Sequence, residues 1–351
     1  MKKLKKNEIN IFREKDELKK IALEICKEEV EKDNGNVIKN FNYAFVLFAN
    51  KKFEEGKIYL DYSSKQEYHG AQLYTYLARD NGWINYDDTL VEANLQKSAE
   101  QGNFMAIFLK AQKFIAEEEY LKAEEYFNKI KFYLPAVIYL RILEIPKNVE
   151  NLEHVKDIIK FIRENVDKDY EHKFDITKGD IYSTTAAFLM NNGMSYLSVD
   201  FLKEAIKIED ETDQDEFIIP AYKQKNKESP TMIFNYQMLG FIYDDLGDFI
   251  KSEENYLRAL SLYSENKDYI DEYNPSFYPN LLNLIGNLYS GLGDKAKAKK
   301  FLKESIFEFE KKNSQDSGYV MSIGNLGIYS DDREEKSKFL KLHLDLVKKK
   351  I

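Results

Sequence analysis

The sequence contains a single cysteine, Cys26, and four histidines. A lone cysteine cannot form a disulfide within the chain, and the apolar stretch around Cys26 predicts a buried structural thiol rather than a nucleophile. No two of the histidines have the spacing of metal ligands on one helix. They are His69, His154, His172 and His343. We therefore expect no disulfide, no zinc site and no cofactor.

The motifs of common enzyme classes are also missing. The sequence has no G-x-x-x-x-G-K-[ST] phosphate loop, no G-x-S-x-G elbow and no H-E-x-x-H zinc motif. Paired acids occur at Glu117–Glu119 and Glu124–Glu125, but they lie in stretches rich in lysine and glutamate, where solvated helix faces are expected. The sequence predicts a protein that is not an enzyme.

Long apolar runs are absent. The longest one, Tyr43–Ala49, is too short to cross a bilayer. The lysines near the N-terminus are followed by further charged residues through Lys20 instead of an apolar segment, so no secretory signal is expected. With only six prolines in the chain, long helices are left intact. We expect a cytoplasmic protein that does not contact membranes.

Basic residues are fewer than acidic ones, 52 against 61, which gives a net charge of −9. An acidic surface repels the phosphate backbone, and the first 40 residues lack the pattern of a helix-turn-helix. Direct DNA binding is therefore not expected. The charge favours a neutral to basic protein or peptide partner, and the sequence leaves the oligomeric state open.

Small residues, in contrast, recur in the C-terminal half at offsets of 0, 7, 12 and 19. The three sets are Ala186, Gly193, Ser198, Ala205; Gly240, Gly247, Ser252, Ala259; and Gly286, Gly293, Ala298, Ser305. Small side chains let two helices approach closely, and the second glycine of a set ends the first helix. One helical hairpin repeated in this way predicts an all-α fold, a right-handed α-solenoid of stacked antiparallel helix pairs.

Two of these units resemble the tetratricopeptide repeat (TPR) family, whose first helix carries Leu-Gly followed by tyrosine. The matching stretches are 238–249, with Leu239, Gly240 and Tyr243, and 285–294, with Gly286 and Tyr289. The unit at Ala186 has Leu189 instead of the aromatic residue. A fourth unit at 325–329 has its tyrosine one residue early and lacks the glycine turn, so we expect a C-terminal cap there. The resemblance implies a scaffold that binds other proteins.

A stretch further upstream resembles a different repeat family. Lys97-Ser98-Ala99-Glu100-Gln101-Gly102, followed by Ala106, is similar to the end of the second helix in Sel1-like repeats.

We expect capping helices over 1–36, Sel1-like or TPR-like repeats over 37–145, a joining helix over 146–173, and TPR-like repeats with a cap over 174–351. The repeats start near residues 179, 233 and 279, and the intervals between these starts exceed the TPR spacing of about 34 residues. Long loops are therefore expected at Glu209–Pro230, which is acidic, and at Ser264–Phe277.

The candidate binding surface is the polar side of the first helix in each unit. Between Pro279 and Ser290 the leucines fall on one side at 100° per residue, and asparagines fall on the other. In TPR proteins that second side lines the concave face, and asparagine can both donate to and accept from an extended peptide. The predicted concave face comprises Asn280, Asn283, Asn287, Ser290, Phe234, Gln237, Phe241, Asp244, Asp180 and Ser183. The alternative is that these are ordinary exposed polar residues.

Two function classes follow from these features. The first is a scaffold for protein-protein interaction that binds a peptide or protein on its concave face. The second is an acidic regulator or inhibitor, of the immunity or anti-defence type, that blocks the basic cleft of a nuclease or toxin. A salt-dependent affinity favours the second class, because surface electrostatics are screened by salt.

Overall fold

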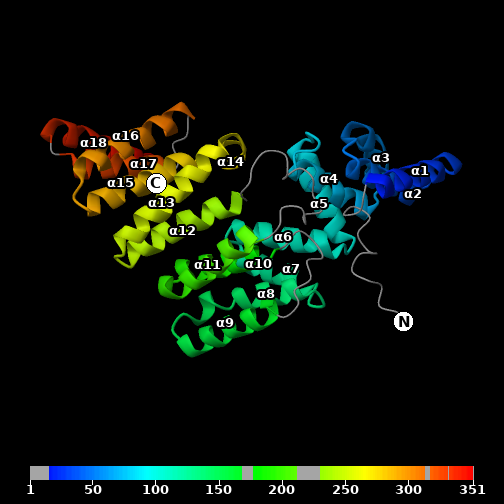
Figure 1. Ribbon diagram of the computed structural model, residues 1–351, viewed down its shortest axis with the longest axis horizontal. Helices are drawn as coiled ribbons and strands as arrows, with labels where there is room; N and C mark the ends of the chain where they lie inside the picture. The colour runs from blue at the N-terminus through cyan, green and yellow to red at the C-terminus, as the bar shows by residue number, and fades with distance from the viewer. Residues whose placement is uncertain (1–15, 168–176, 212–229, 313–316, 331, 351) are drawn as a thin grey trace. The chain divides into compact units, whose positions relative to one another are not determined.

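The computed structural model describes residues 16–167, 177–211, 230–312, 317–330 and 332–350. In these ranges the chain is helical, from α1 to α18, with one 3-10 turn and no strand. The chain divides into two compact units, one of residues 1–169 with 213–225 and one of residues 170–212 with 226–351 (Figure 1). Most of the predicted acidic loop, part of the N-terminal cap and the end of the joining segment lie outside the described residues.

The first unit consists of consecutive helices joined by short turns. The main pairs are α2 with α3, α4 with α5, and α6 with α7, and α1 packs against α2. The helices are α1 (Asp16–Lys32), α2 (Val37–Ala49), α3 (Phe53–Lys65), α4 (His69–Asp80), α5 (Asp88–Glu100), α6 (Phe104–Ala116), α7 (Tyr120–Asn128), α8 (Leu134–Ile142) and α9 (Leu152–Asp167), with the 3-10 turn Pro146–Asn148 before α9.

The second unit repeats the same arrangement. Its helices are α10 (Lys178–Asn191), α11 (Ser195–Glu211), α12 (Pro230–Asp245), α13 (Phe249–Glu265), α14 (Lys267–Tyr273), α15 (Phe277–Gly291), α16 (Lys295–Lys311), α17 (Ser317–Tyr329) and α18 (Arg333–Lys350). Each of α10, α12, α15 and α17 pairs with the next long helix, and these first helices also contact one another in order. The predicted all-α fold of stacked helix pairs is confirmed. The expected loop Ser264–Phe277 instead contains the short helix α14.

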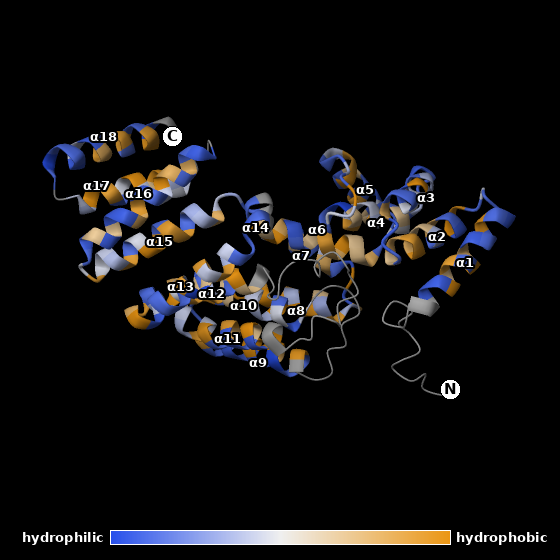
Figure 2. Cartoon of the chain, turned by 45° about the horizontal axis from the view of Figure 1, so that its top comes forward, coloured by the Kyte–Doolittle hydropathy of each residue, from blue (hydrophilic) through white to orange (hydrophobic). Residues whose placement is uncertain are grey.

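The helices are amphipathic, as Figure 2 shows by the alternation of apolar and polar residues along α1 and α18. One continuous core of the second unit runs through α12, α13 and α15, with Tyr256, Leu262 and Leu281 buried at its centre. Side chains that alternate in this way bury one face of each helix and leave the other for solvent.

Close packing of the pairs depends on the small residues. A Cβ added to Gly240 would lie 2.4 Å from the ring of Tyr256, and one added to Gly286 would lie 2.8 Å from Cγ of Leu302. The Ser252 hydroxyl donates to the Gly240 carbonyl oxygen at 2.8 Å, which ties α13 to α12. The predicted role of these glycines in helix contact is confirmed.

The glycines at the hairpin turns have a different role. Gly193, Gly247 and Gly293 have φ values of +76°, +77° and +78°, in the left-handed region that favours glycine. An aspartate follows two of them, and Asp248 and Asp294 cap the next helix by accepting from backbone N–H groups. The same backbone turn is thus used three times, which sets the angle between the helices of each pair.

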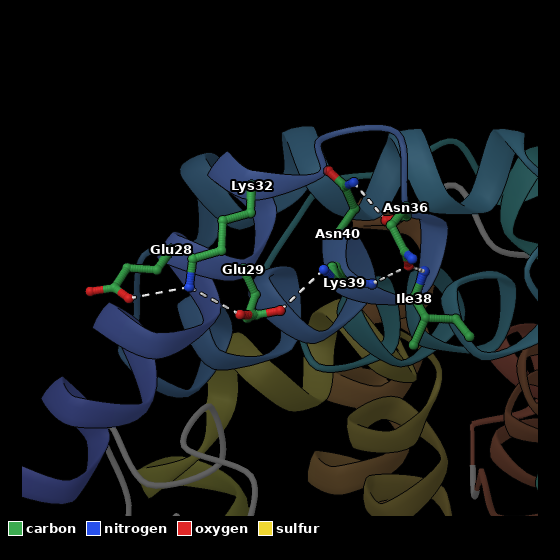
Figure 3. A network of polar contacts seen from close by, with 7 residues as sticks. All are labelled: Glu28, Glu29, Lys32, Asn36, Ile38, Lys39 and Asn40. Carbon is green, nitrogen blue, oxygen red and sulfur yellow. Dashed lines mark hydrogen bonds and ion pairs between the residues drawn. The ribbon is translucent and has the colours of Figure 1, made fainter.

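At the start of the first unit, a polar network joins α1 to α2 (Figure 3). The Glu29 carboxylate lies 3.1 Å from Lys39 Nζ on α2 and 3.3 Å from Lys32 Nζ on its own helix. These lysines lower the pKa of Glu29. Asn36 caps α2 through its Oδ1, which accepts from the N–H groups of Ile38 and Lys39. The half-buried Cys26 packs against the buried cluster of Val30, Tyr43 and Leu47, and burial raises the pKa of its thiol.

Candidate functional site

The ten residues of the predicted concave face come from α10, α12 and α15, which follow one another as first helices of their pairs. Phe241 is the most exposed of them, with 43% of its surface accessible. Ser183 and Asn283 are buried, and the other seven are half-buried. Equivalent positions in the three helices therefore differ widely in their access to a partner.

On α15, two of the predicted asparagines face the following pair. Asn283 is buried, and its Oδ1 accepts a hydrogen bond at 3.2 Å from Nδ2 of Asn325 on α17. Asn280 lies against Gly318, where an added Cβ would be 1.9 Å from its Oδ1. Both side chains are thus part of the contact between α15 and α17.

Asn287 and Ser290, on the same helix, are half-buried. Oδ1 of Asn287 is shielded from solvent and has no hydrogen-bond partner. The amide of Asn287 is therefore not committed to helix packing in the way that the amide of Asn283 is.

On α12, Phe234 packs edge-on against Phe277, with ring centroids 4.9 Å apart and an interplanar angle of 77°. This contact places Phe234 at the border of the core rather than in open solvent. Gln237 and Asp244 are half-buried on either side of Phe241 in the sequence. Burial, together with the neighbouring Asp245, raises the pKa of Asp244.

On α10, Asp180 closes a capping box with Thr177. The Thr177 N–H donates to Asp180 Oδ2 at 2.7 Å, and the Asp180 N–H donates to Thr177 Oγ1 at 2.9 Å. Reciprocal bonds of this kind stabilise a helix N-terminus. Ser183, one turn further, is buried and its hydroxyl has no partner. Asp180 is thus bonded to the start of its own helix, and Ser183 is withdrawn from solvent.

Sequence reasoning missed a hollow of about 330 Å³ among α11, α12 and α13. Its walls come from Lys203, Ile206, Tyr236, Leu239, Tyr243, Lys251, Glu254 and Asn255. A comparison of the second helices of successive repeats, position by position from the first glycine of each repeat, could have revealed it. Asn255 lies 15 residues after Gly240, and the position 15 residues after Gly286 is the aromatic Phe301.

A fully buried amide at Asn235 was also missed. Both its Nδ2 and its Oδ1 lack a hydrogen-bond partner, although Asn235 has no exposed surface. Five residues before Gly240, it occupies the position that Ile181 has in α10 and Leu281 has in α15. Both of those side chains are fully buried, so Asn235 is a polar residue at a core position of the repeat.

Metal ligands do not gather anywhere in the described ranges, where no three His, Cys, Asp or Glu side chains are close enough to hold an ion. Among those same residues, no helix combines the length and apolar character needed to cross a bilayer.

The family model of the tetratricopeptide repeat matches residues 235–266 and 279–306. These ranges coincide with the pairs α12–α13 and α15–α16, whose glycines and turns are described above. The chain is a tetratricopeptide-like repeat protein. Its two matched repeats carry most of the predicted concave face and six of the eight residues that line the hollow. No curated protein sequence matches this chain at a significant level.

Several solved structures are similar to this chain at low sequence identity. A chain of the APC/C hetero-tetramer Cut9–Hcn1 is 12% identical with a TM-score of 0.51, over 93% of this chain and 52% of that chain. The TPR-like repeats of a putative kinesin light chain from Podosopora anserina are 14% identical with a TM-score of 0.44, over 62% and 98%. Yeast Tom70 is 14% identical with a TM-score of 0.41, over 95% and 60%. At such identities the likeness concerns the fold alone.

Proposed function

We propose that this tetratricopeptide-like repeat protein is a non-catalytic module that binds a peptide or protein partner along the predicted concave face of α10, α12 and α15. A fold of this kind suggests a protein-protein interaction scaffold, and the family is generally non-catalytic. The proposed site of action is the cytoplasm. The proposed partner is neutral or basic, because the chain has a net charge of −9 and this face includes Asp244.

The exposure of Phe241 is the observation that carries this proposal. Gln237 and Asp244 lie four residues before and three residues after it, on the same side of α12. An exposed aromatic ring with polar neighbours has the composition of an interaction hot spot, where an apolar anchor supplies affinity and polar groups supply orientation.

Asn287 extends the face onto the next pair. It follows Gly286 directly, as Phe241 follows Gly240, so the two residues have the same register in successive first helices. Its Oδ1 is shielded from solvent, so the group that can meet the backbone of an extended peptide is Nδ2, which donates. The aromatic anchor and this amide together define the core of the proposed site.

The test is a quantitative pull-down from a lysate of the native host, with wild-type protein and two variants as baits. Phe241→Ala removes the proposed anchor, and Phe307→Ala removes an aromatic side chain of α16 that is 61% exposed. We expect a partner that is lost with Phe241→Ala and retained with Phe307→Ala, while both variants melt as the wild type does. A set of captured proteins that Phe241→Ala leaves unchanged would contradict the proposal.

Once the partner is identified, its binding properties distinguish a scaffold that binds through Phe241 from an acidic inhibitor. Binding through Phe241 is dominated by apolar contact and changes little between low and moderate salt. A partner that is itself a basic nuclease or toxin, whose affinity falls steeply with salt and is indifferent to Phe241→Ala, would instead indicate an inhibitor acting through the acidic surface.

A further inference from the structure

The hollow among α11, α12 and α13, called here the α11–α13 hollow, lies on the side of α12 away from Phe241. Its base is formed by Leu239 and Tyr243 of α12, which are both buried. Lys203 and Lys251 are exposed residues of α11 and α13 at its rim. These three helices succeed one another in the second unit, as Figure 1 shows.

The next repeat explains why the hollow is open. There, Phe301 of α16 stacks on Tyr289, with ring centroids 5.6 Å apart and an interplanar angle of 14°. Tyr243 has the same register as Tyr289, but the residue that corresponds to Phe301 is Asn255. The shorter Asn255 side chain bonds back to its own helix, donating to the Lys251 carbonyl oxygen at 2.7 Å. The aromatic filler of the following repeat is therefore missing here.

Two cations take its place beside the tyrosine ring. Nζ of Lys251 lies 5.2 Å and Nζ of Lys203 lies 5.9 Å from the centroid of Tyr243, within the range of cation–π attraction. Lys251 is also bonded to Asp248 at 2.5 Å. Lys203 has no carboxylate partner among the described residues. The rim thus offers an uncompensated positive charge next to a polarisable ring, in a chain whose net charge is negative.

Glu254 is the one carboxylate among the residues that line the hollow. It is exposed on α13 and opposes the attraction of the lysines for an anion. Among the described residues no ion pair joins it to Lys203, so the ammonium group of Lys203 remains available to a ligand. Apart from these three charged residues and Asn255, the lining is apolar or aromatic. A ligand that matches these walls carries a negative group and, beside it, an apolar one.

We propose that the α11–α13 hollow is a second interaction site, which binds an acidic peptide segment of a partner protein. A carboxylate of the segment lies between Lys203 and Lys251. A neighbouring apolar side chain packs against Ile206, Tyr236 and Leu239, in the space that Phe301 fills one repeat later. This site takes a partner of opposite charge to the one proposed for the predicted concave face, so the two faces recruit different segments.

The experiment uses the full chain, fluorescently labelled, on an array of immobilised peptides. Each peptide has Asp or Glu next to Phe, Leu or Trp, and each has a counterpart in which the acids are Asn or Gln. We expect binding to acidic members, and binding about tenfold weaker to their amide counterparts, because a charge-matched contact is lost. An array on which no acidic member binds, or on which acids and amides bind equally, would overturn the proposal.

Variants locate the binding. Asn255→Phe fills the hollow as Phe301 does in the next repeat, and Lys203→Gln with Lys251→Gln removes the charge without adding volume. We expect Asn255→Phe to abolish binding and the double variant to weaken it about tenfold, as the amide peptides do, whereas Glu254→Gln strengthens it. Lys297→Gln is the matched control, since Lys297 has the register of Lys251 where Phe301 is present. Peptide binding that persists in both Asn255→Phe and the double variant would refute the site. Phe241→Ala leaves peptide binding unchanged, which separates this site from the predicted concave face.

Discussion

Asn283 on α15 accepts a hydrogen bond from Asn325 on α17, with 3.2 Å between Oδ1 and Nδ2. The bond joins two successive helix pairs at a point where Asn283 is buried. Asn283 occupies the same position of the repeat as Gln237 and Ser183 in the preceding pairs. The position therefore recurs in each repeat, whereas the hydrogen bond to Asn325 is particular to this contact.

The first prediction concerns this bond. Asn325→Ala leaves the buried Oδ1 of Asn283 without its donor, and a buried acceptor that loses its partner costs about 1–3 kcal/mol. We expect the free energy of unfolding of the second unit to fall by this amount in urea titrations. Asn287→Ala is the control and should be nearly neutral, because Oδ1 of Asn287 already has no partner. Equal losses in the two variants would mean that the bond is not what stabilises the contact.

The second prediction concerns the approach of α12 to α13. Gly240→Ala introduces a Cβ 2.4 Å from the Tyr256 ring, and overpacking of this kind costs about 1–3 kcal/mol. Gly291→Ala is the matched control, since nothing lies within 4 Å of its added Cβ at the end of α15. We expect a lower urea midpoint for Gly240→Ala and an unchanged or higher midpoint for Gly291→Ala. A Gly240→Ala variant as stable as the wild type would show that the two helices separate without cost.

The third prediction is a gain in stability. Asn235→Leu replaces a fully buried amide without partners by the side chain that α15 has at the same register, Leu281. Burying an unpaired polar group costs about 1–3 kcal/mol, and removing it should raise the free energy of unfolding by a comparable amount. Leu281→Asn, the reverse exchange, should destabilise. A decrease in stability with Asn235→Leu would indicate that the amide has a partner such as a buried water molecule.

The fourth prediction concerns pH. Glu335 of α18 accepts from Lys299 and from Ser330 and pairs with Lys303 at 3.0 Å, and these contacts lower its pKa to about 2. A carboxyl group with a lowered folded-state pKa stabilises the fold above its unfolded pKa of about 4.3, and this contribution is lost as the pH falls toward the folded value.

The corresponding measurement is the urea midpoint as a function of pH. We expect wild type and Glu335→Gln to differ most above about pH 4.3 and to converge as the pH falls toward 2. A constant difference over this window would show that Glu335 acts through packing and not through its charge.

The pairing of helices was accessible from the sequence because it depends on local spacing. Gly240 and Gly286 lie at fixed distances from Gly247 and Gly293, and the hairpin follows from a close approach in the helix and a left-handed turn after it. Both requirements are properties of the backbone. They are met within one repeat, whatever the neighbouring repeats contain.

The chemical identity of each exposed surface was not accessible in the same way. Helical periodicity put Asn283 and Asn287 on one side of α15, but only the packing of α17 buried the first and engaged its amide. The α11–α13 hollow likewise requires three helices from two pairs, and it opens because Asn255 lacks the ring of Phe301.

The sequence by itself therefore determined the repeat, the turns and the residues that share a helix face. The tertiary structure alone decided which of those residues remain accessible to a partner. The physical reason is that the solvent exposure of a side chain depends on the volume and polarity of the residues that the next helix pair packs against it. The period of its own helix does not say which residues these are.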